Sequence, residues 1–217
     1  MLLNPETIRL ILQRRATLKA EFDIERIFDQ IQESCIPSYC HSNPFAAAVA
    51  WWRLLAVQNL YSRYQRPGPI LDFGAGTGEM FHFLNPHGEY HFVEQDEHLA
   101  ATLSRWIPSA QREYLDRLEK KFITIFALDS LEHNEDIAGL IVALARALHP
   151  QGSLIISGPT ENMLYRLGRR IAGFNAYYHI NTIYEIESIL REHLQCVACR
   201  TIPAGIPLFR ISVWQPC

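Results

Sequence analysis

The chain has 217 residues, 48% of them hydrophobic and 20% charged, which is enough for one globular domain with a sizeable core. A formal net charge of -3 with no prominent basic patch excludes a general electrostatic attraction to nucleic acid or to an anionic membrane. Five cysteines, an odd number, do not suggest a disulfide framework, and with no signal-peptide pattern and no bilayer-length apolar run we expect a cytoplasmic protein.

The first 65 residues are predicted to be helical. Asn4-Pro5 and Asn43-Pro44 each join a capping side chain to the helix position that best tolerates a missing N–H group. Between them, "DIERIFDQIQES" places apolar side chains at helical spacing, with Asp23 as the cap. We therefore expect three helices in an N-terminal extension, residues 1–65, that packs on a core domain at residues 66–217.

From Pro69 onward, strand-like runs alternate with helical segments. "FITIFAL" and "SLIIS" are continuously apolar, which is typical of parallel strands buried on both faces. A further helix is expected at about residues 182–193, and "QCVACRTI" and "LFRISVW" predict a final antiparallel hairpin. This order predicts an α/β fold, a doubly wound Rossmann-like seven-stranded sheet that is mostly parallel, with helices on both faces. The remaining strand candidates are "PILDF", "YHFVE" and "AQREYL", and the helical candidates are "EMFHFL", "EHLAATLSRW", "DIAGLIVALARALH" and "NMLYRLGRRIAGF".

The stretch "GPILDFGAGTGEM" ends a buried strand in Asp72 and then places Gly74, Gly76 and Gly78 in the turn. Without Cβ atoms the backbone can adopt positive φ angles and approach a ligand, and the helix that follows offers N–H groups to a carboxylate or phosphate. In an open α/β sheet this turn faces the crevice at the carboxyl ends of the strands. A tight connection without a ligand is the alternative, but the strand-turn-helix context favours a binding site.

The next predicted strand, "YHFVE", ends in Glu94, which lies twenty residues after Gly74. At about this distance an acidic side chain can accept hydrogen bonds from the ribose of a nucleoside bound over the sheet. Asp96 lies past the strand and is expected to cap the helix that begins near Glu97. A dinucleotide-binding turn would need a glycine at Glu79, so the residues favour an adenosine-type cofactor that is not a dinucleotide.

"ILDFGAGTGEM" resembles motif I of the class I S-adenosylmethionine (SAM) dependent methyltransferases, and "HFVEQDEHLA" is similar to the acidic end of their second strand. "FITIFALDSLEHNEDIAGLIVALARALHPQGSLIISGPTEN" is similar to the fourth strand, the "LEH" element, the following helix and the fifth strand of the small-molecule branch of that family. The resemblance covers about residues 70–160. The chain departs from the family pattern at Gln151, where a second glycine is frequent, and in a short third-strand region.

The resemblance implies a SAM site at the glycine turn. Gly74, Ala75 and Gly76 would line the methionine half of SAM. Asp72 would order the turn or reach the amino group through water, and Glu94 would hold the ribose.

The resemblance also implies cofactor contacts from residues that follow the third and fourth strands. In the family an acidic residue after the third strand commonly meets the adenine amino group, and Asp116 is the best candidate here. Leu128, Asp129 and Ser130 follow the fourth strand and would face the sulfonium, although a helix cap explains Asp129 equally well. The expected cofactor residues are Asp72, Gly74, Ala75, Gly76, Gly78, Glu94, Gln95, Asp116, Leu128, Asp129 and Ser130.

The reaction implied is direct displacement, in which the protein mainly aligns the nucleophile with the methyl carbon. If a hydroxyl nucleophile needs a general base, His133 of "LEH" or His179 of "AYYHIN" can serve, although hydrogen-bonded structural histidines are the commoner case.

The acceptor is expected to be a small molecule or metabolite conjugate, anionic or hydrophobic. The segment "GPTENMLYRLGRRIAGFNAYYHIN" follows the fifth strand at the same edge and is expected to wall the acceptor pocket. Its arginines would contact an anionic acceptor or simply form a solvated helix face. Trp51 and Trp52 would cover a hydrophobic acceptor or pack in the core. The polar and basic residues concerned are Asn162, Tyr165, Arg166, Arg169, Arg170, Tyr177, Tyr178 and His179.

The cysteines offer a weaker alternative, a zinc site. Cys35, Cys40, Cys196 and Cys199, with His41, are ligand types that zinc accepts. Because side chains alternate along a strand, however, Cys196 and Cys199 are expected on opposite faces of the sheet. We therefore expect ordinary thiols and no metal.

Three functional hypotheses stay open from the sequence. The leading one is a SAM-dependent methyltransferase. The second is an NAD(P)-dependent oxidoreductase of similar topology, which the missing glycine at Glu79 disfavours. The third is a non-catalytic protein that binds SAM.

Overall fold

The computed structural model of the protein describes residues 4–24, 34–84, 88–118, 121–171, 180–203 and 207–217. The chain forms two compact units, Met1–Leu54 and Leu55–Cys217. The expected division into an extension at 1–65 and a domain at 66–217 stays a prediction.

Most of the described residues of the N-terminal region are helical. Helix α1 spans Pro5–Glu21, α3 spans Ile36–Cys40 and α4 spans Pro44–Tyr64. The predicted starts are confirmed, because Asn4 Oδ1 accepts the Thr7 N–H at 2.7 Å and Asn43 Oδ1 accepts the Phe45 N–H at 2.9 Å. The helix expected after Asp23 falls mostly on residues 25–33, outside the described residues.

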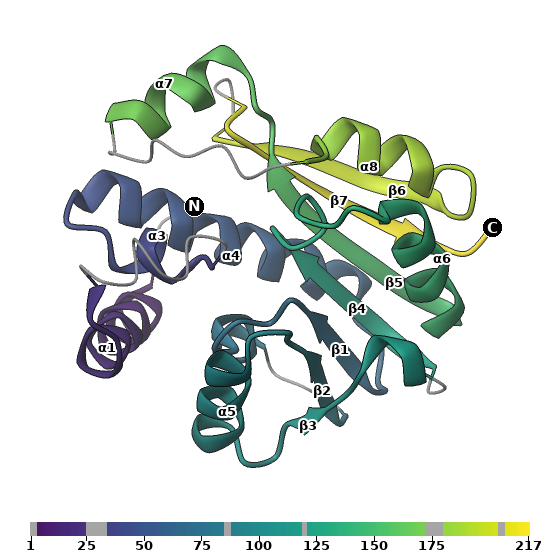
Figure 1. The fold of residues 1–217 in the computed structure, drawn as a ribbon, viewed down its shortest axis with the longest axis horizontal. Coiled ribbons are helices and arrows are strands. Elements are labelled where there is room, and N and C mark those ends of the chain that lie inside the picture. Colours follow the sequence, from purple (N-terminus) through teal and green to yellow (C-terminus); the bar gives the residue numbers. More distant parts are fainter. Residues whose placement is uncertain (1–3, 25–33, 85–87, 119–120, 172–179, 204–206) are drawn as a thin grey trace. The chain divides into compact units, whose positions relative to one another are not determined.

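The second unit contains a seven-stranded sheet with the order β3-β2-β1-β4-β5-β7-β6 (Figure 1). The first five of these strands are parallel, and β7 is antiparallel to both β5 and β6. The predicted Rossmann-like fold is therefore confirmed, including its C-terminal hairpin. The strands span Ile70–Phe73 (β1), Tyr90–Val93 (β2), Gln111–Arg112 (β3), Phe122–Leu128 (β4), Leu148–Pro159 (β5), Gln195–Ile202 (β6) and Phe209–Gln215 (β7).

Three elements differ in length or type from the expectation. Strand β3 has only two residues, paired with His91 and Phe92 of β2. Strand β5 begins at Leu148, before the apolar run, because Leu148 pairs with Phe122 and the register then shifts before Thr124. The segment after the glycine turn is a short 3-10 helix, η1 (Glu79–Phe83), rather than a full α-helix.

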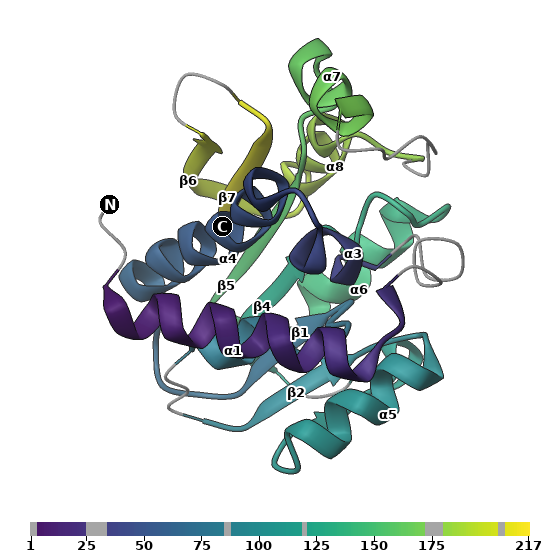
Figure 2. The same ribbon diagram turned by 90° about the vertical axis from the view of Figure 1, so that its left-hand side faces the viewer.

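Helices cover both faces of the sheet. The helices after β2 are α5 (Glu97–Trp106), α6 (Ile137–Ala147), α7 (Met163–Ile171) and α8 (Ile183–Leu190). Helices α6 and α8 contact each other and β5, whereas α5 contacts β3. Figures 1 and 2 show α5 beside the β2–β3 end of the sheet and α8 beside the β7–β6 end. On the face opposite α6, Tyr61 from the second half of α4 meets the Phe126 ring edge-on, with 5.4 Å between ring centroids.

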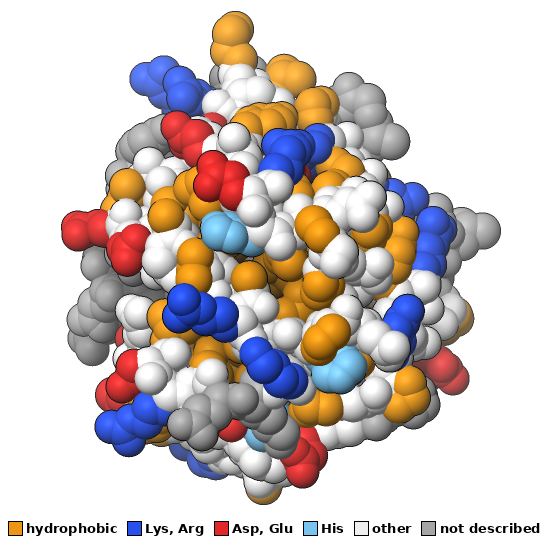
Figure 3. All heavy atoms as spheres, turned by 90° about the vertical axis from the view of Figure 1, so that its right-hand side faces the viewer, with side chains coloured by type: hydrophobic (Ala, Val, Ile, Leu, Met, Phe, Trp, Pro, Cys, Tyr) orange, Lys and Arg blue, Asp and Glu red, His pale blue; other side chains and the backbone are white. Residues whose placement is uncertain are grey.

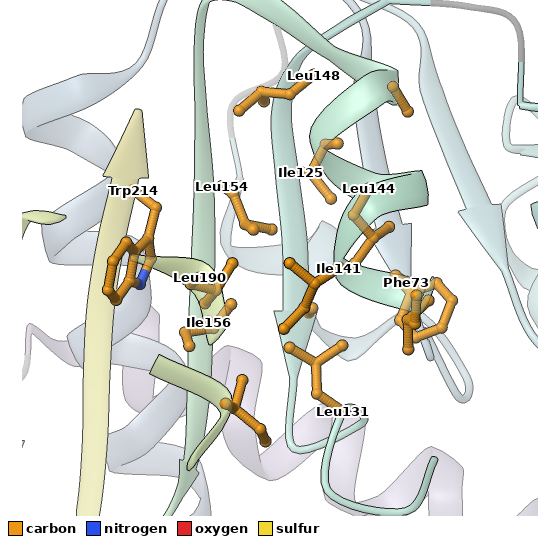
Figure 4. Packing of buried hydrophobic residues seen from close by; sticks show 14 of the residues in the cluster. Phe73, Ile125, Leu131, Ile141, Leu144, Leu148, Leu154, Ile156, Leu190 and Trp214 are labelled. Carbon is orange, nitrogen blue, oxygen red and sulfur yellow. The ribbon is translucent and has the colours of Figure 1, made fainter. Parts of the chain in front are cut away.

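Alternation along β4 explains this two-sided packing. Ile125 and Ala127 belong to an apolar cluster that includes Leu154 of β5, Leu144 of α6 and Leu190 of α8 (Figure 4). Phe126 lies between them in sequence and points to the other face, so both faces of β4 are buried. Burying each large aliphatic side chain stabilises the fold by roughly 1.5–3 kcal/mol.

The surface shows no sign of one dominant charge on the face drawn in Figure 3, which includes α6 and α8. Lys and Arg side chains stand beside Asp and Glu side chains there, around a central group of apolar side chains. Among the helices of the described ranges, none combines the length and the apolar composition needed to cross a bilayer.

Truncating the cluster should be costly. Leu144 is fully buried, so Leu144→Ala should lower the free energy of unfolding by about 2–5 kcal/mol through lost apolar contact and the cavity left behind. Leu164 is 51% exposed, and Leu164→Ala is the matched control, with an expected change within about 0.5 kcal/mol. Urea unfolding of both variants measures this difference, and equal losses would contradict the assigned packing.

Candidate cofactor site

The loop after β1, residues 74–78, which we call the glycine loop, is held against both neighbouring strands. Gly74 and Ala75 donate their N–H groups to the Val93 carbonyl of β2 at 2.8 and 3.3 Å. Ser130, just after β4, donates its hydroxyl to the Phe73 carbonyl at 3.0 Å. The carboxyl ends of β2, β1 and β4 therefore meet at this loop, the edge where open α/β sheets bind ligands.

Two glycines of the loop are needed for different reasons. Gly74 has a φ angle of 69°, and a Cβ built on it would lie 2.3 Å from the Ser130 Cβ, so close packing excludes a side chain there. Gly76 has a φ angle of 56°, but a Cβ on it would meet no atom within 4 Å. The backbone at Gly76 thus borders open space, into which a ligand can come close.

Glu94 ties the glycine loop to the junction between β2 and α5. Its Oε2 accepts the Gly76 N–H at 2.7 Å, and its Oε1 accepts the Asp96 N–H at 2.9 Å. A carboxylate has about four acceptor positions, so these two bonds leave about two more. Asp96 caps α5 by accepting the Leu99 N–H at 2.9 Å, as expected, and Gln95 is exposed.

Asp72 is a buried carboxyl group behind the loop. Only 3% of the residue is exposed, and the Tyr90 hydroxyl donates to Asp72 Oδ2 at 2.6 Å. Burial raises the pKa of Asp72 to about 7; the Tyr90 hydrogen bond opposes this shift, and the charge of Glu94 adds to it. Close to neutral pH, Asp72 therefore exists in both protonation states.

The end of β4 is joined to the end of β5. Asp129 has a φ angle of 51°, donates its N–H to the Ser157 carbonyl at 2.9 Å and accepts the Ser157 hydroxyl on Oδ1 at 2.9 Å. The helix-cap explanation of Asp129 is wrong, because Asp136 caps α6 by accepting the Gly139 N–H at 2.9 Å. Leu128 is buried at the end of the strand.

The other expected site residues lie farther along the edge or outside the described ranges. Asp116 is exposed in a short 3-10 helix, η2 (Leu115–Arg117), with its Oδ2 3.6 Å from Arg117 Nε, and its adenine contact stays a prediction. His133 is half-buried beside Glu132, whose carbonyl accepts the N–H groups of Ile180 and Asn181 at 2.9 and 3.1 Å. His179, immediately before Ile180, lies outside the described residues.

A family model described as "Methyltransferase domain" matches residues 52–193, more than half of the chain and a range that includes the glycine loop, Glu94 and strands β4 and β5. The chain belongs to this methyltransferase family. A comparison with curated proteins gives no significant match.

Solved structures share the fold of this methyltransferase at low sequence identity. The N-methyltransferase NodS from Bradyrhizobium japonicum WM9, in complex with S-adenosyl-L-homocysteine (SAH), is 16% identical, with a TM-score of 0.64 over 83% of this chain and 91% of that chain. The magnesium protoporphyrin IX methyltransferase from Synechocystis PCC 6803, with bound SAH, is 16% identical, with a TM-score of 0.64 over 81% of this chain and 88% of that chain. These likenesses establish a common fold.

The segment after β5 of this methyltransferase is anchored by polar side chains. Asn162 accepts the Tyr165 N–H at 2.8 Å at the start of α7 and donates to the Pro207 carbonyl at 2.6 Å. The Tyr165 ring meets Phe209 edge-on, with 5.5 Å between centroids. Arg166 has a 63% exposed side chain whose Nε lies 3.9 Å from Glu161. Arg170 is also exposed, the side chain of Arg169 is not described, and Tyr177 and Tyr178 lie outside the described residues.

The two tryptophans of α4 differ in environment. Trp51 is buried and donates its indole N–H to the Tyr39 carbonyl at 3.1 Å, so it packs in the core of the N-terminal unit. Trp52 is 44% exposed.

The prediction that Cys196 and Cys199 lie on opposite faces of the sheet is wrong. In β6, Cys196 pairs with Trp214 and Cys199 with Ser212, which are two residues apart and so lie on one face of β7. The register shifts between Cys196 and Ala198, and this irregularity brings both cysteines to the same face. Across the described part of the chain, no three His, Cys, Asp or Glu side chains are grouped so that they could hold a metal.

Tyr90 and Arg112 also contact residues of this site in the methyltransferase, and neither was predicted from the sequence. Tyr90 begins β2 and bonds to Asp72, while Arg112 ends β3 and donates to the Glu94 carbonyl at 2.9 Å. Neither residue belongs to a motif. Only their positions in the sequence could have indicated them, since each is a polar residue on a strand that borders β1 or β2.

Substitutions in the glycine loop should distinguish the loss of stability caused by a packing clash at Gly74 from the loss of ligand binding caused by a side chain at Gly76. Gly76→Ala introduces no clash and should cost about 1–2 kcal/mol of stability through its left-handed backbone, while it obstructs the open space. Gly74→Ala should destabilise more strongly, because its Cβ meets Ser130, and Ser130→Gly in the same chain should restore part of the loss. Thermal unfolding and SAH calorimetry measure the two effects; full SAH affinity in Gly76→Ala would contradict the assigned role of the open side.

Asp72 should make stability pH-dependent. Because its folded pKa of about 7 exceeds its usual 3.8, the folded state holds this proton more tightly, and the Asp72 contribution to stability falls as pH rises from about 4 to about 7. At about 1.4 kcal/mol per pKa unit the full effect is about 4 kcal/mol.

Asp72→Asn removes the ionisable group and keeps an oxygen acceptor for Tyr90. Its free energy of unfolding, relative to wild type, should therefore be higher at pH 8 than at pH 5, measured by urea unfolding. The exposed Asp116→Asn is the control, with little change at either pH. A difference for Asp72→Asn that is the same at both pH values would show that burial does not shift this group.

Proposed function

We propose that this chain is a SAM-dependent methyltransferase whose acceptor is a small molecule or a metabolite conjugate. The observation that carries the proposal is the corner formed by Gly76 and Glu94, where bare backbone borders open space and a carboxylate lies 2.7 Å from its N–H group. Membership of the methyltransferase family supports the reaction class. SAH bound to two proteins of the same fold supports the choice of cofactor.

The chemistry of the corner fits SAM. The two acceptor positions of Glu94 that its backbone bonds leave free match the number of ribose hydroxyls. SAM carries positive charge at its sulfonium and its amino group, and Asp72 and Glu94 supply negative charge nearby. In this proposal Gly74, Ala75 and Gly76 line the methionine half, and Leu128, Asp129 and Ser130 line the sulfonium side. Gln95 and Asp116 are proposed to border the adenosine.

The chain then acts mainly by orientation. When bound, SAM would supply an activated methyl group, and the electron pair of its carbon–sulfur bond would return to sulfur as the bond to the acceptor forms. The glycine loop and Glu94 hold one reactant, so the acceptor need only be aligned from the other side. Such alignment contributes up to about 7–11 kcal/mol in favourable cases.

The acceptor is proposed to enter beside the ends of β4 and β5. Ile180 and Asn181 donate their N–H groups to the Glu132 carbonyl, and these two residues therefore lie close to the neighbouring His133. His133 is the proposed proton acceptor for a hydroxyl nucleophile, with His179 as a second candidate. The exposed Arg166 and Arg170 are suited to an anionic group on the acceptor.

The proposed setting is the cytoplasm, where thiols stay reduced. All five cysteines of the chain are present as thiols.

The cofactor assignment predicts which ligands stabilise the protein. SAM and SAH should raise the melting temperature and NAD(P) should not, because only a ligand of the folded state shifts unfolding by mass action. Glu94→Ala should weaken SAH binding by at least about tenfold, since it removes a charged hydrogen-bond acceptor.

Asp96→Ala is the matched control for this test. It removes the α5 cap and should cost about 0.5–2 kcal/mol of stability, but it should leave the SAH affinity close to that of wild type. Stabilisation of wild type by NAD(P) alone, or equal SAH affinity in Glu94→Ala and wild type, would contradict the proposal.

A further inference from the structure

Arg112 is the last residue of β3, and its side chain reaches the corner of Glu94 from the side away from the glycine loop. One terminal nitrogen donates to the Glu94 carbonyl at 2.9 Å and to Glu97 Oε1 at 2.8 Å. The other terminal nitrogen donates to Glu97 Oε2 at 2.7 Å. The guanidinium carbon lies 5.2 Å from the centre of the Tyr114 ring. A single side chain therefore contacts the residue that follows β2, the first turn of α5 and the segment after β3.

The planarity of the guanidinium group gives these contacts a fixed geometry. Its N–H groups point in set directions, so the paired bonds to Glu97 also fix where the bond to the Glu94 carbonyl lies. Both pKa values reflect the pair: the hydrogen bond from Arg112 lowers the pKa of Glu97, and the hydrogen bond to Glu97 raises the pKa of Arg112. The Arg112 side chain is 22% exposed and the Glu97 side chain is 79% exposed. An ion pair so close to solvent adds little to the free energy of unfolding by itself.

Glu94 is thus held at two places. Its carbonyl accepts from Arg112, and its carboxylate accepts from the N–H groups of Gly76 and Asp96. Strand β2 ends at Val93, so the strand ladder does not continue through Glu94. Within the described contacts, the backbone of Glu94 is fixed from the β3 side by Arg112.

We propose that Arg112 is a positioning residue for cofactor binding: its planar fork fixes the backbone of Glu94, and thereby sets the carboxylate for the ribose of the cofactor. The inference rests on the proposed SAM function, because it assigns Glu94 to the ribose. Arg112 itself makes no contact with the cofactor in this account. Loss of Arg112 should therefore weaken binding specifically through the ribose hydroxyls and leave the remainder of the ligand contacts intact.

A first measurement tests the positioning without any ligand. Amide hydrogen exchange at Gly76 and Asp96 reports the two bonds to the Glu94 carboxylate. Arg112→Met should speed exchange at both amides by about threefold or more, the size expected for coupled neighbours, with little change in the melting temperature. Arg146→Met, which replaces an exposed arginine of α6, is the control and should leave both amides unchanged. Unchanged exchange in Arg112→Met would overturn the inference.

A second measurement connects the positioning to the ribose. Calorimetry should show that wild type binds 2′-deoxy-SAH about tenfold or more weakly than SAH, because one hydroxyl no longer reaches a carboxylate. In Arg112→Met the SAH affinity should fall and the ratio between the two ligands should shrink by about threefold or more. A merely structural role would weaken both ligands equally, leave the ratio unchanged and overturn the inference.

Two further variants keep the test decisive if Arg112→Met folds poorly. Arg112→Lys keeps the charge but not the planar fork, so it should resemble Arg112→Met, and wild-type behaviour of this variant would show that charge alone suffices and overturn the inference. Glu97→Gln retains the bond to the Glu94 carbonyl and should shift the ligand ratio less than Arg112→Lys; an equal or larger shift would overturn the assigned role of that bond. Failure of wild type to bind SAH would contradict the proposed function itself, and the exchange measurement distinguishes that failure from a failure of Arg112.

Discussion

The hydrogen bond from the Gly76 N–H to the Glu94 carboxylate is the contact on which the site depends. It joins the loop after β1 to the end of β2, and the same carboxylate also accepts from Asp96 at the start of α5. The bond requires a backbone that can turn through a positive φ angle at Gly76, and it leaves the other side of that residue open. The Glu94 carboxylate therefore joins the glycine loop, the end of β2 and the start of α5 at one edge of the sheet.

The electrostatics of this corner suit a cationic ligand. Asp72 is buried, has a raised pKa and is hydrogen-bonded to Tyr90, and the charge of Glu94 makes its ionisation more costly. A positively charged group bound nearby would favour the ionised form of Asp72. In the folded protein the negative charge of Asp72 is therefore unfavourable, and a cation bound nearby would reduce that cost.

The sequence predicted those parts of the fold and site that depend on local pattern. Continuous apolar runs predicted β4 and β5. Gly74 and Gly76 stood out in the sequence as closely spaced glycines after a strand, and the structure requires glycine there, through close packing at Gly74 and a positive φ angle at both positions. Glu94 was predicted as a site residue because it ends the next predicted strand, twenty residues after Gly74. The family model then confirmed the methyltransferase resemblance that these motifs carry.

Contacts that depend on register across strands could not be predicted. Tyr90 and Arg112 reach the site only because β2 and β3 lie in order beside β1, and neither sequence position shows how far its side chain extends. Strict alternation placed Cys196 and Cys199 on opposite faces, but a single register shift in β6 reversed that result. The pKa of Asp72 depends on its burial and on Tyr90, which the sequence alone does not give.

A crystal structure of the protein with bound SAH tests the central claim most directly. We expect the homocysteine portion along residues 74–76, over the open side of Gly76, and both ribose hydroxyls within hydrogen-bond distance of the Glu94 carboxylate. SAH bound elsewhere on the molecule, or a Glu94 side chain directed away from the ribose, would contradict the account.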